Sequence, residues 1–214
     1  MKTNITELVF IIDRSGSMQG LEKDTIGGYN SLLEKQKKLS DTAMVTTVLF
    51  DDRYEVLHNR ENIKTVANIT EDEYFVRGST ALLDAIGKAV LRISKKQKNL
   101  PACNRADKVV VVITTDGYEN ASVKFTSHKV KALVERHKEK YGWEFIFLGA
   151  NIDSFAAAES FGISRNRTAN YHADAEGTKK NFDVLSKIVA AVRTEGELSD
   201  YCMNEIHEDF ANRK

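Results

Sequence analysis

Three short segments of the chain carry oxygen-bearing side chains close together. Asp13, Ser15 and Ser17 alternate along the first segment, Thr80 lies in a Ser-Thr pair, and Asp116 lies in a Thr-Thr-Asp-Gly run. Carboxylates and hydroxyls are hard donors that suit Mg²⁺, Mn²⁺ or Ca²⁺. No histidine or cysteine accompanies them, which makes the set poor for zinc or copper. The predicted chemistry is therefore the binding of one divalent ion.

Each of these residues, taken alone, also has an ordinary structural interpretation. Aspartates and serines after a strand are common turn residues and helix N-caps, and Thr80 would suit the cap of a following helix. Asp116 followed by Gly117 would make a simple turn. A metal site requires that the three segments converge, and the elements around them decide whether they can.

Short apolar runs rich in Val, Ile and Phe predict strands that are buried on both faces, as in a parallel sheet covered by helices. These runs span residues 8–12, 43–50, 109–113 and 145–148. Residues 54–57 are predicted to pair antiparallel with the second run, and residues 168–171 could form a last short strand. The sheet is therefore expected to be mostly parallel, with one antiparallel edge.

Between the strands, apolar residues recur at helical spacing and predict five helices. They fall within residues 21–33, 82–93, 130–134, 155–161 and 182–192. This alternation predicts an α/β fold with a doubly wound, mostly parallel central sheet of about six strands and helices on both faces. We expect this domain to span residues 1–194, with 195–214 as a tail or appended helix.

The predicted architecture brings the oxygen donors together. In open parallel sheets, ligands bind outside the carboxyl ends of the strands. Asp13 and Asp116 directly follow strands that are expected to be neighbours, and Thr80 opens the second helix.

The pattern Asp13-x-Ser15-x-Ser17, then Thr80, then Asp116-Gly resembles the metal ion-dependent adhesion site (MIDAS) of von Willebrand factor A (VWA) domains, with all five positions filled. The resemblance follows the element order over nearly the whole chain. It implies a Rossmann-like fold in which the two serines and the threonine ligate the ion through hydroxyls. The two aspartates would act directly or through bound water.

The resemblance also implies a function. Neutral hydroxyls leave much of the ion's charge uncompensated, so a further position favours an Asp or Glu carboxylate from a partner protein. The chain is accordingly expected to be a bacterial-type, stand-alone, cytoplasmic member of the family that binds a protein partner through the metal. It is not expected to be an enzyme.

Two other functions place an acidic residue at the end of a first parallel strand. A magnesium-dependent hydrolase or phosphotransferase would use Asp13 as its nucleophile, but the second aspartate that such enzymes carry is replaced here by Arg-Ser-Gly-Ser. A nucleotide-binding Rossmann protein would need a glycine-rich turn where this chain has Asp13 and two serines. Both remain weaker alternatives, and the hydrolase is the stronger of the two.

Composition limits the partners. The chain has 214 residues, and its 31 Lys and Arg balance its 31 Asp and Glu. A neutral chain lacks the basic excess typical of general nucleic-acid or membrane-surface binders. The apolar run at residues 8–12 is too short for a signal peptide or a membrane span. Cys103 and Cys202 are expected to be free thiols, in agreement with a cytoplasmic location.

Several residues outside the motif receive weaker predictions. Four are expected on the rim of the site, where they would select the partner: Arg14, Met18, Tyr118 and Glu119. Asp51 and Asp52 are expected in an edge turn, with a supporting contact near the metal as the alternative. Asp153 is expected to cap a helix, and Gly27-Gly28 to allow close packing of the first helix on the sheet. All histidines are expected at the surface: His58, His128, His137, His172 and His207.

Overall fold

The predicted apolar runs form the centre of a six-stranded sheet in the computed structural model, which describes residues 4–213. The strands are β1 (Ile5–Asp13), β2 (Thr42–Phe50), β3 (Tyr54–Asn62), β4 (Lys108–Thr115), β5 (Glu144–Gly149) and β6 (Thr168–Asn170). Their order is β3-β2-β1-β4-β5-β6. Only β3 pairs antiparallel, with β2, and the other pairs are parallel. The expected sheet is confirmed, including its antiparallel edge.

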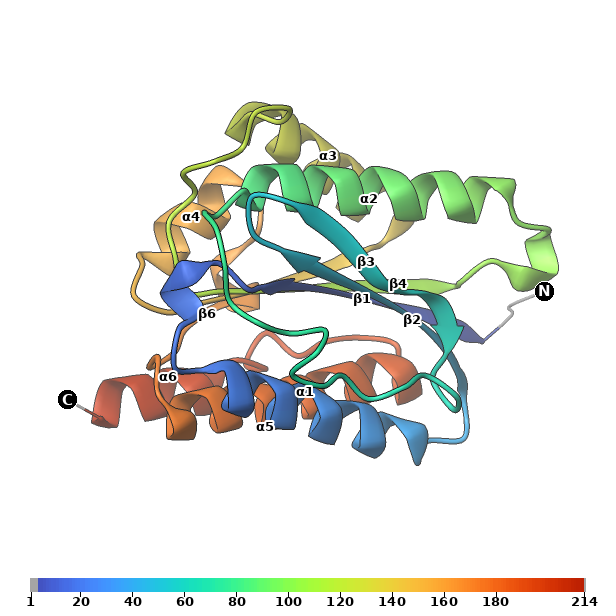
Figure 1. Cartoon of the computed structure of the whole chain (residues 1–214). Coiled ribbons are helices and arrows are strands. Elements are labelled where there is room, and N and C mark those ends of the chain that lie inside the picture. The colour runs from blue at the N-terminus through green and yellow to red at the C-terminus, as the bar shows by residue number, and fades with distance from the viewer. Residues whose placement is uncertain (1–3, 214) are drawn as a thin grey trace.

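Helices cover both faces of this sheet (Figure 1). One face carries α1 (Glu22–Lys37), α5 (Ala175–Thr194) and α6 (Asn204–Asn212). The other carries α2 (Leu82–Asn99), α3 (Ser127–Tyr141) and α4 (Ser154–Ser160). Alternate residues of β1 enter the two cores: Leu8, Phe10 and Ile12 join the first, and Val9 and Ile11 the second. Burial on both faces explains why this strand is apolar without interruption.

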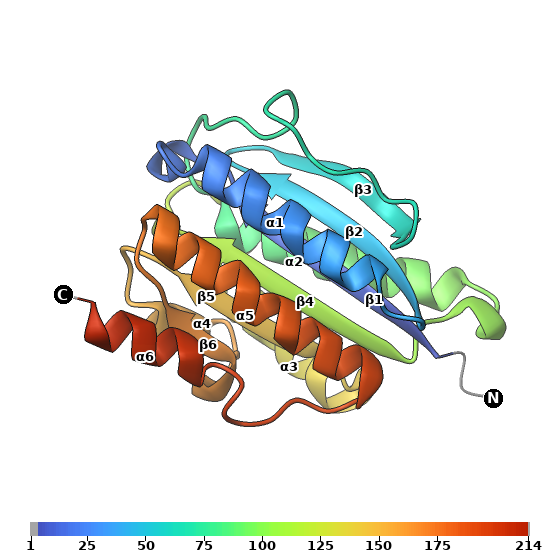
Figure 2. The same cartoon turned by 90° about the horizontal axis from the view of Figure 1, so that it is seen from below.

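The helices α1 and α5 lie side by side across one face (Figure 2). Gly28 of α1 permits this contact, because a Cβ built there would lie 2.3 Å from the ring of Phe182 on α5. Gly27 has nothing within 4 Å of the equivalent position. The predicted close packing therefore holds for Gly28 only, and its partner is a helix and not the sheet.

The C-terminal segment includes a helix that shares the core of the preceding elements. Met203 and Ile206 are buried in the same hydrophobic cluster as α1 and α5. The Nε2 atom of His207 lies 3.0 Å from the carbonyl oxygen of Thr168 on β6. Within residues 195–214, which were predicted as a tail or an appended helix, α6 occupies residues 204–212. No helix within the described range 4–213 is long and apolar enough to cross a membrane.

The expectation that all histidines lie at the surface is wrong for His58 and His137. Their exposed fractions are 5% and 3%. The Nδ1 atom of His58 lies 2.9 Å from Thr47 Oγ1 across the β2–β3 pair, and that of His137 lies 2.7 Å from the carbonyl oxygen of Leu133. Burial lowers the pKa of both imidazoles. Isolated histidines gave no periodic signal, so the sequence did not show that they face a core.

Candidate metal site

The sheet brings the ends of β1 and β4 to one edge. Ile12 pairs with Thr114 in parallel register, which places Asp13 level with Thr115 and close to Asp116. The chain leaves β1 toward α1 on one face and leaves β4 toward α3 on the other. Connections that diverge to opposite faces open a crevice at the edge of the sheet, which is where ligands bind in such folds.

Three hydroxyls meet at this edge of the sheet. A short 3-10 turn (Gly16–Met18) follows β1, and the Oγ atoms of Ser15 and Ser17 lie 3.0 Å apart. Thr80 precedes α2 and donates to Ser15 Oγ at 2.9 Å. Thr80 therefore does not cap α2, whose N-cap residue is Ala81. A Cβ on Gly117 would lie 2.8 Å from Ser17 Oγ and 3.2 Å from Thr80 Oγ1, so glycine leaves space beside these oxygens.

The two aspartates are buried beside the hydroxyls. Asp13 accepts hydrogen bonds from Ser15 N at 2.6 Å and from Thr115 Oγ1 at 2.5 Å. Burial raises the pKa of Asp13 to about 6 despite these bonds, with a smaller contribution from the charge of Asp116. Burial also raises the pKa of Asp116, against a hydrogen bond from Ser17. A nearby cation would stabilise the charged form of both carboxylates.

These residues fit a hard divalent ion. Asp116 Oδ1 is buried and has no hydrogen-bond partner in the described part of the chain. Oxygens that ligate one Mg²⁺ at right angles lie about 3 Å apart, close to the spacings of the three hydroxyls. Ser17 is exposed, which leaves the oxygens open to solvent. Within residues 4–213, no three His, Cys, Asp or Glu side chains form a separate cluster suited to a metal.

The loop that follows Asp116 fixes the segment around Thr80. Thr80 N donates to Asn120 Oδ1 at 2.9 Å, and Asn120 N donates to the Thr80 carbonyl at 3.0 Å. Glu119 accepts from Leu83 N at 2.8 Å and from Ser122 N at 2.7 Å. The sequence suggested no such role for Asn120, because nothing local links it to a threonine at a distance of 40 residues.

A family model for the von Willebrand factor type A domain matches residues 7–184. The chain belongs to this family. Among curated proteins, no sequence matches the chain significantly. The resemblance read from the motif is thus confirmed for the family, while the ligand set of this VWA domain stays a prediction.

Solved structures share the fold at low sequence identity. The PilB minor pilin from Streptococcus sanguinis has a TM-score of 0.57 at 14% identity, with 90% of this chain and 63% of that chain covered. Proximal thread matrix protein 1 from the mussel byssus, with a zinc-occupied MIDAS motif, has a TM-score of 0.57 at 15% identity, with 86% of this chain and 45% of that chain covered. The pilus adhesin SpaC from Lactobacillus rhamnosus GG has a TM-score of 0.65 at 11% identity, with 87% of this chain and 30% of that chain covered. This VWA domain therefore spans less than two thirds of each of these chains.

The rim of the site differs from the prediction. Arg14 and Met18 are buried, with exposed fractions of 0% and 2%. Glu119 is turned toward backbone amides, as described above. Only Tyr118, at 62% exposure, presents most of its side chain to solvent. Arg14 and Met18 are turned into the molecule, whereas Ser17 between them is exposed.

Asp51 lies in the expected edge turn between β2 and β3, and its side chain also binds two arginines. It is fully buried at the end of β2 and accepts from Arg14 Nε at 2.9 Å and Arg77 Nε at 2.7 Å. Burial alone would raise its pKa, but hydrogen bonds from Arg77, Arg53 N and Arg14 hold the pKa below its usual range. Its position after a strand at the same sheet edge was the reason for keeping a supporting contact as the alternative to the turn. Asp153 caps α4 as predicted, accepting from Ala156 N.

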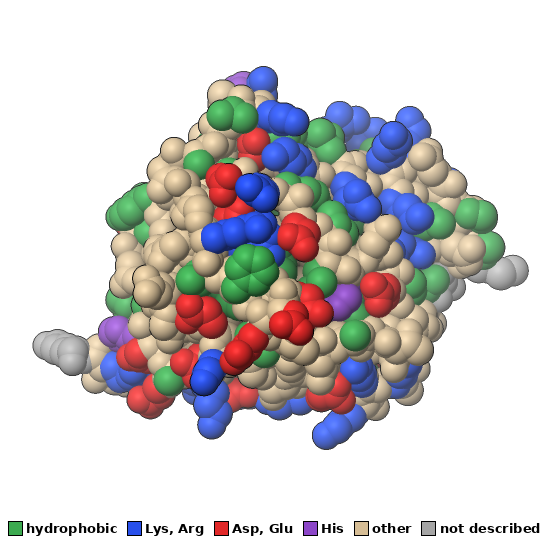
Figure 3. Space-filling model, viewed as in Figure 1, with side chains coloured by type: hydrophobic (Ala, Val, Ile, Leu, Met, Phe, Trp, Pro, Cys, Tyr) green, Lys and Arg blue, Asp and Glu red, His purple; other side chains and the backbone are tan. Residues whose placement is uncertain are grey.

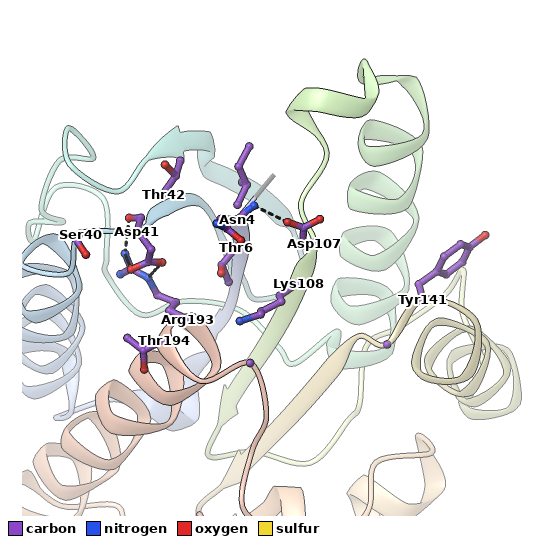
Figure 4. A pocket seen from close by; sticks show the side chains of 13 residues that line it. Asn4, Thr6, Ser40, Asp41, Thr42, Asp107, Lys108, Tyr141, Arg193 and Thr194 are labelled. Atoms are coloured by element: carbon purple, nitrogen blue, oxygen red, sulfur yellow. Dashed lines mark hydrogen bonds and ion pairs between the residues drawn. The ribbon is translucent and has the colours of Figure 1, made fainter. Parts of the chain in front are cut away.

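On the face shown in Figure 3, acidic and basic side chains occur together, with basic ones gathered over α2. Lys96 and Lys98 occupy the last turn of this helix, where positive charge is favoured. A hollow of about 810 Å³ lies at the opposite, amino edge of the sheet (Figure 4). It contains none of the motif residues.

Proposed function

We propose that this VWA domain is a divalent-metal-dependent protein-binding module. One ion is held by Ser15, Ser17 and Thr80, with Asp13 and Asp116 acting directly or through water. The remaining position of the ion accepts an Asp or Glu carboxylate from a partner protein. The convergence of the three hydroxyls beside the unpartnered Asp116 Oδ1 is the observation that carries this proposal.

The donor set favours magnesium, manganese or calcium. All five side chains offer oxygen, which these ions prefer, whereas zinc favours nitrogen and sulfur. The mussel byssus protein nevertheless has a MIDAS occupied by zinc. Zinc therefore belongs among the ions to be tested, and we expect it to compete with magnesium without being preferred in the cell.

The arrangement favours binding over catalysis. Both oxygens of Asp13 accept hydrogen bonds, from Ser15 N and Thr115 Oγ1, and its side chain has no exposure. A nucleophilic aspartate would have to face its substrate. No histidine or lysine occurs between residues 13 and 18 or between 114 and 119 to serve as a general base. The hydrolase alternative thus finds no support in the geometry of Asp13.

The two cysteines of this VWA domain bear on its cellular location. Neither Cys103 nor Cys202 forms a disulfide. Free thiols suit the cytoplasmic location that we propose for this VWA domain. The solved structures that share its fold include a pilin and a pilus adhesin, so location is proposed for this chain separately from theirs.

A peptide array tests the partner class. Each peptide that contains an Asp or Glu is paired with a copy that carries Asn or Gln, and the array is probed in Mg²⁺ and in EDTA. We expect binding that needs both the acidic residue and the metal. Peptides bound equally well in EDTA, or equally well as their amides, contradict a metal-bridged contact.

A further inference from the structure

A permanent positive charge is buried beside the proposed cation site. Arg14 lies between Asp13 and Ser15 in the sequence, and its side chain is 1% exposed. A guanidinium does not lose its proton in a protein, and a buried charge needs partners. Unless it is neutralised, this arginine would repel the ion.

The guanidinium of Arg14 donates to groups other than the motif residues. Each of its three nitrogens donates: Nε to Asp51 Oδ2 at 2.9 Å, Nη2 to Glu55 Oε2 at 2.6 Å, and Nη1 to the Glu73 carbonyl at 3.2 Å. Its Cζ carbon lies 5.4 Å from the centre of the Phe75 ring. All of these partners belong to the β2–β3 hairpin or to the connection that follows it.

Asp51 joins this arginine to the threonine segment. The oxygen that accepts from Arg14 also accepts from Arg77 Nε at 2.7 Å, and Arg77 N donates to the Arg14 carbonyl at 2.9 Å. On either side of Thr80, Gly16 N donates to the Gly78 carbonyl at 3.1 Å and Ala81 N donates to the Asp51 carbonyl at 3.0 Å.

The connection from β3 to α2, residues 63–81, contains no helix or strand. Thr80 stands near its end. A long irregular connection has many conformations, and fixing it on ligand binding costs conformational entropy. Contacts that fix it beforehand raise the affinity for whatever Thr80 helps to bind.

We propose that Arg14, Asp51 and Arg77 form a clamp that holds the Thr80 segment against the serine loop and thereby sets the affinity of the site for its cation. Asp51 is the central positioning residue, because one oxygen of its carboxylate accepts from both arginines and joins the two segments. Glu55 supplies the second negative charge that balances the two guanidinium groups. This inference rests on the proposed function, since it assumes that the site binds a divalent ion.

The decisive variant is Asp51→Asn, which keeps the shape of the side chain and removes its charge. Asp41→Asn is a matched control at the opposite edge of the sheet. There, the buried Arg193 donates to Asp41 at 2.8 and 2.9 Å (Figure 4). Both changes remove a carboxylate from a buried arginine, although Arg14 keeps its ion pair with Glu55, and only the first change affects the clamp.

Two measurements are needed: the Mn²⁺ dissociation constant by calorimetry, and amide hydrogen exchange in EDTA. We expect Asp51→Asn to weaken Mn²⁺ binding by at least about tenfold, as is typical for residues that orient metal ligands. In EDTA, the amides of Gly16 and Ala81 should exchange faster in Asp51→Asn than in wild type. Asp41→Asn should alter neither measurement. If Asp51→Asn does not fold, Arg77→Gln takes its place, at a side chain that is 32% exposed. This variant should show the same changes to a smaller degree.

Other results would overturn the inference. Unchanged exchange at Gly16 and Ala81 in both clamp variants means that no clamp exists. If wild type binds Mn²⁺ and both clamp variants bind it equally well, the clamp does not set the affinity of the site. The proposed function then still stands. Wild type that binds no divalent ion contradicts the proposed function and this inference together.

Discussion

At the scale of single residues, the site depends on the groups that position the hydroxyl oxygens of Ser15, Ser17 and Thr80. Asp13 uses both carboxylate oxygens to fix Ser15 N and Thr115 Oγ1, so its first role is to shape the serine loop. Gly117 contributes by the absence of a side chain. These two residues explain why hydroxyls that would otherwise face water are gathered within hydrogen-bond distance of each other.

Gly117→Ala tests this description of the site. The added methyl would lie 2.8 Å from Ser17 Oγ and must displace it. We expect Mn²⁺ affinity to fall by about tenfold or more, with the free energy of unfolding changed by less than about 1 kcal/mol, because the loop lies at the molecular surface. Calorimetry and urea unfolding in EDTA give the two values. Unchanged Mn²⁺ affinity would show that Gly117 does not border the ion.

At the scale of elements, the two adjacent glycines of α1 differ in surroundings. Gly28→Ala should lower the free energy of unfolding by about 1–3 kcal/mol, because its Cβ would lie 2.3 Å from a Phe182 ring atom. Gly27→Ala should raise it by about 0.5–1 kcal/mol, because alanine favours the helix and nothing lies within 4 Å. Urea unfolding of both variants measures this, and effects of the same sign would contradict the α1–α5 contact.

Elements with a strong pattern were predictable and isolated side chains were not. The strand β1 could be recognised because Leu8 to Ile12 are apolar without a break, and its neighbours followed from the same signal. Arg14 could not be placed, because its partner Asp51 lies 37 residues away and only the pairing of β1 with β2 brings them together. Asp13 and Asp116 could be predicted to lie close together because they follow strands that are adjacent in the sheet, whereas Thr80 was included because it completes the motif.

At the scale of the whole molecule, buried histidines make stability depend on pH. The pKa of His58 and of His137 is lowered from 6.5 in the folded state. The unfolded chain then binds more protons, so each histidine's contribution to stability falls as the pH drops below about 6.5, by at most about 1.4 kcal/mol per pH unit. The raised pKa of Asp13 acts in the opposite direction, since its contribution is lost as the pH rises through about 6.

Urea unfolding of wild type and His137→Gln at pH 7.5 and 5.5 isolates the histidine. The variant should lose less stability than wild type on acidification, while Asp13 affects both proteins equally. His128→Gln, at an exposed position, is the control and should behave as wild type. A pH dependence that is the same in all three proteins would show that His137 is not buried in the neutral form.

The topology of the molecule places the site at the point where the connections of β1 and β4 diverge. The proposed function and the clamp both depend on whether a divalent ion binds there. Calorimetric titration of Mn²⁺ into wild type, Asp13→Asn and Asp183→Asn is the most direct test, because Asp183 is an exposed aspartate paired with Lys35 far from the motif. We predict one ion bound to wild type and to Asp183→Asn, and none to Asp13→Asn. The same heat of binding in wild type and Asp13→Asn would contradict the account.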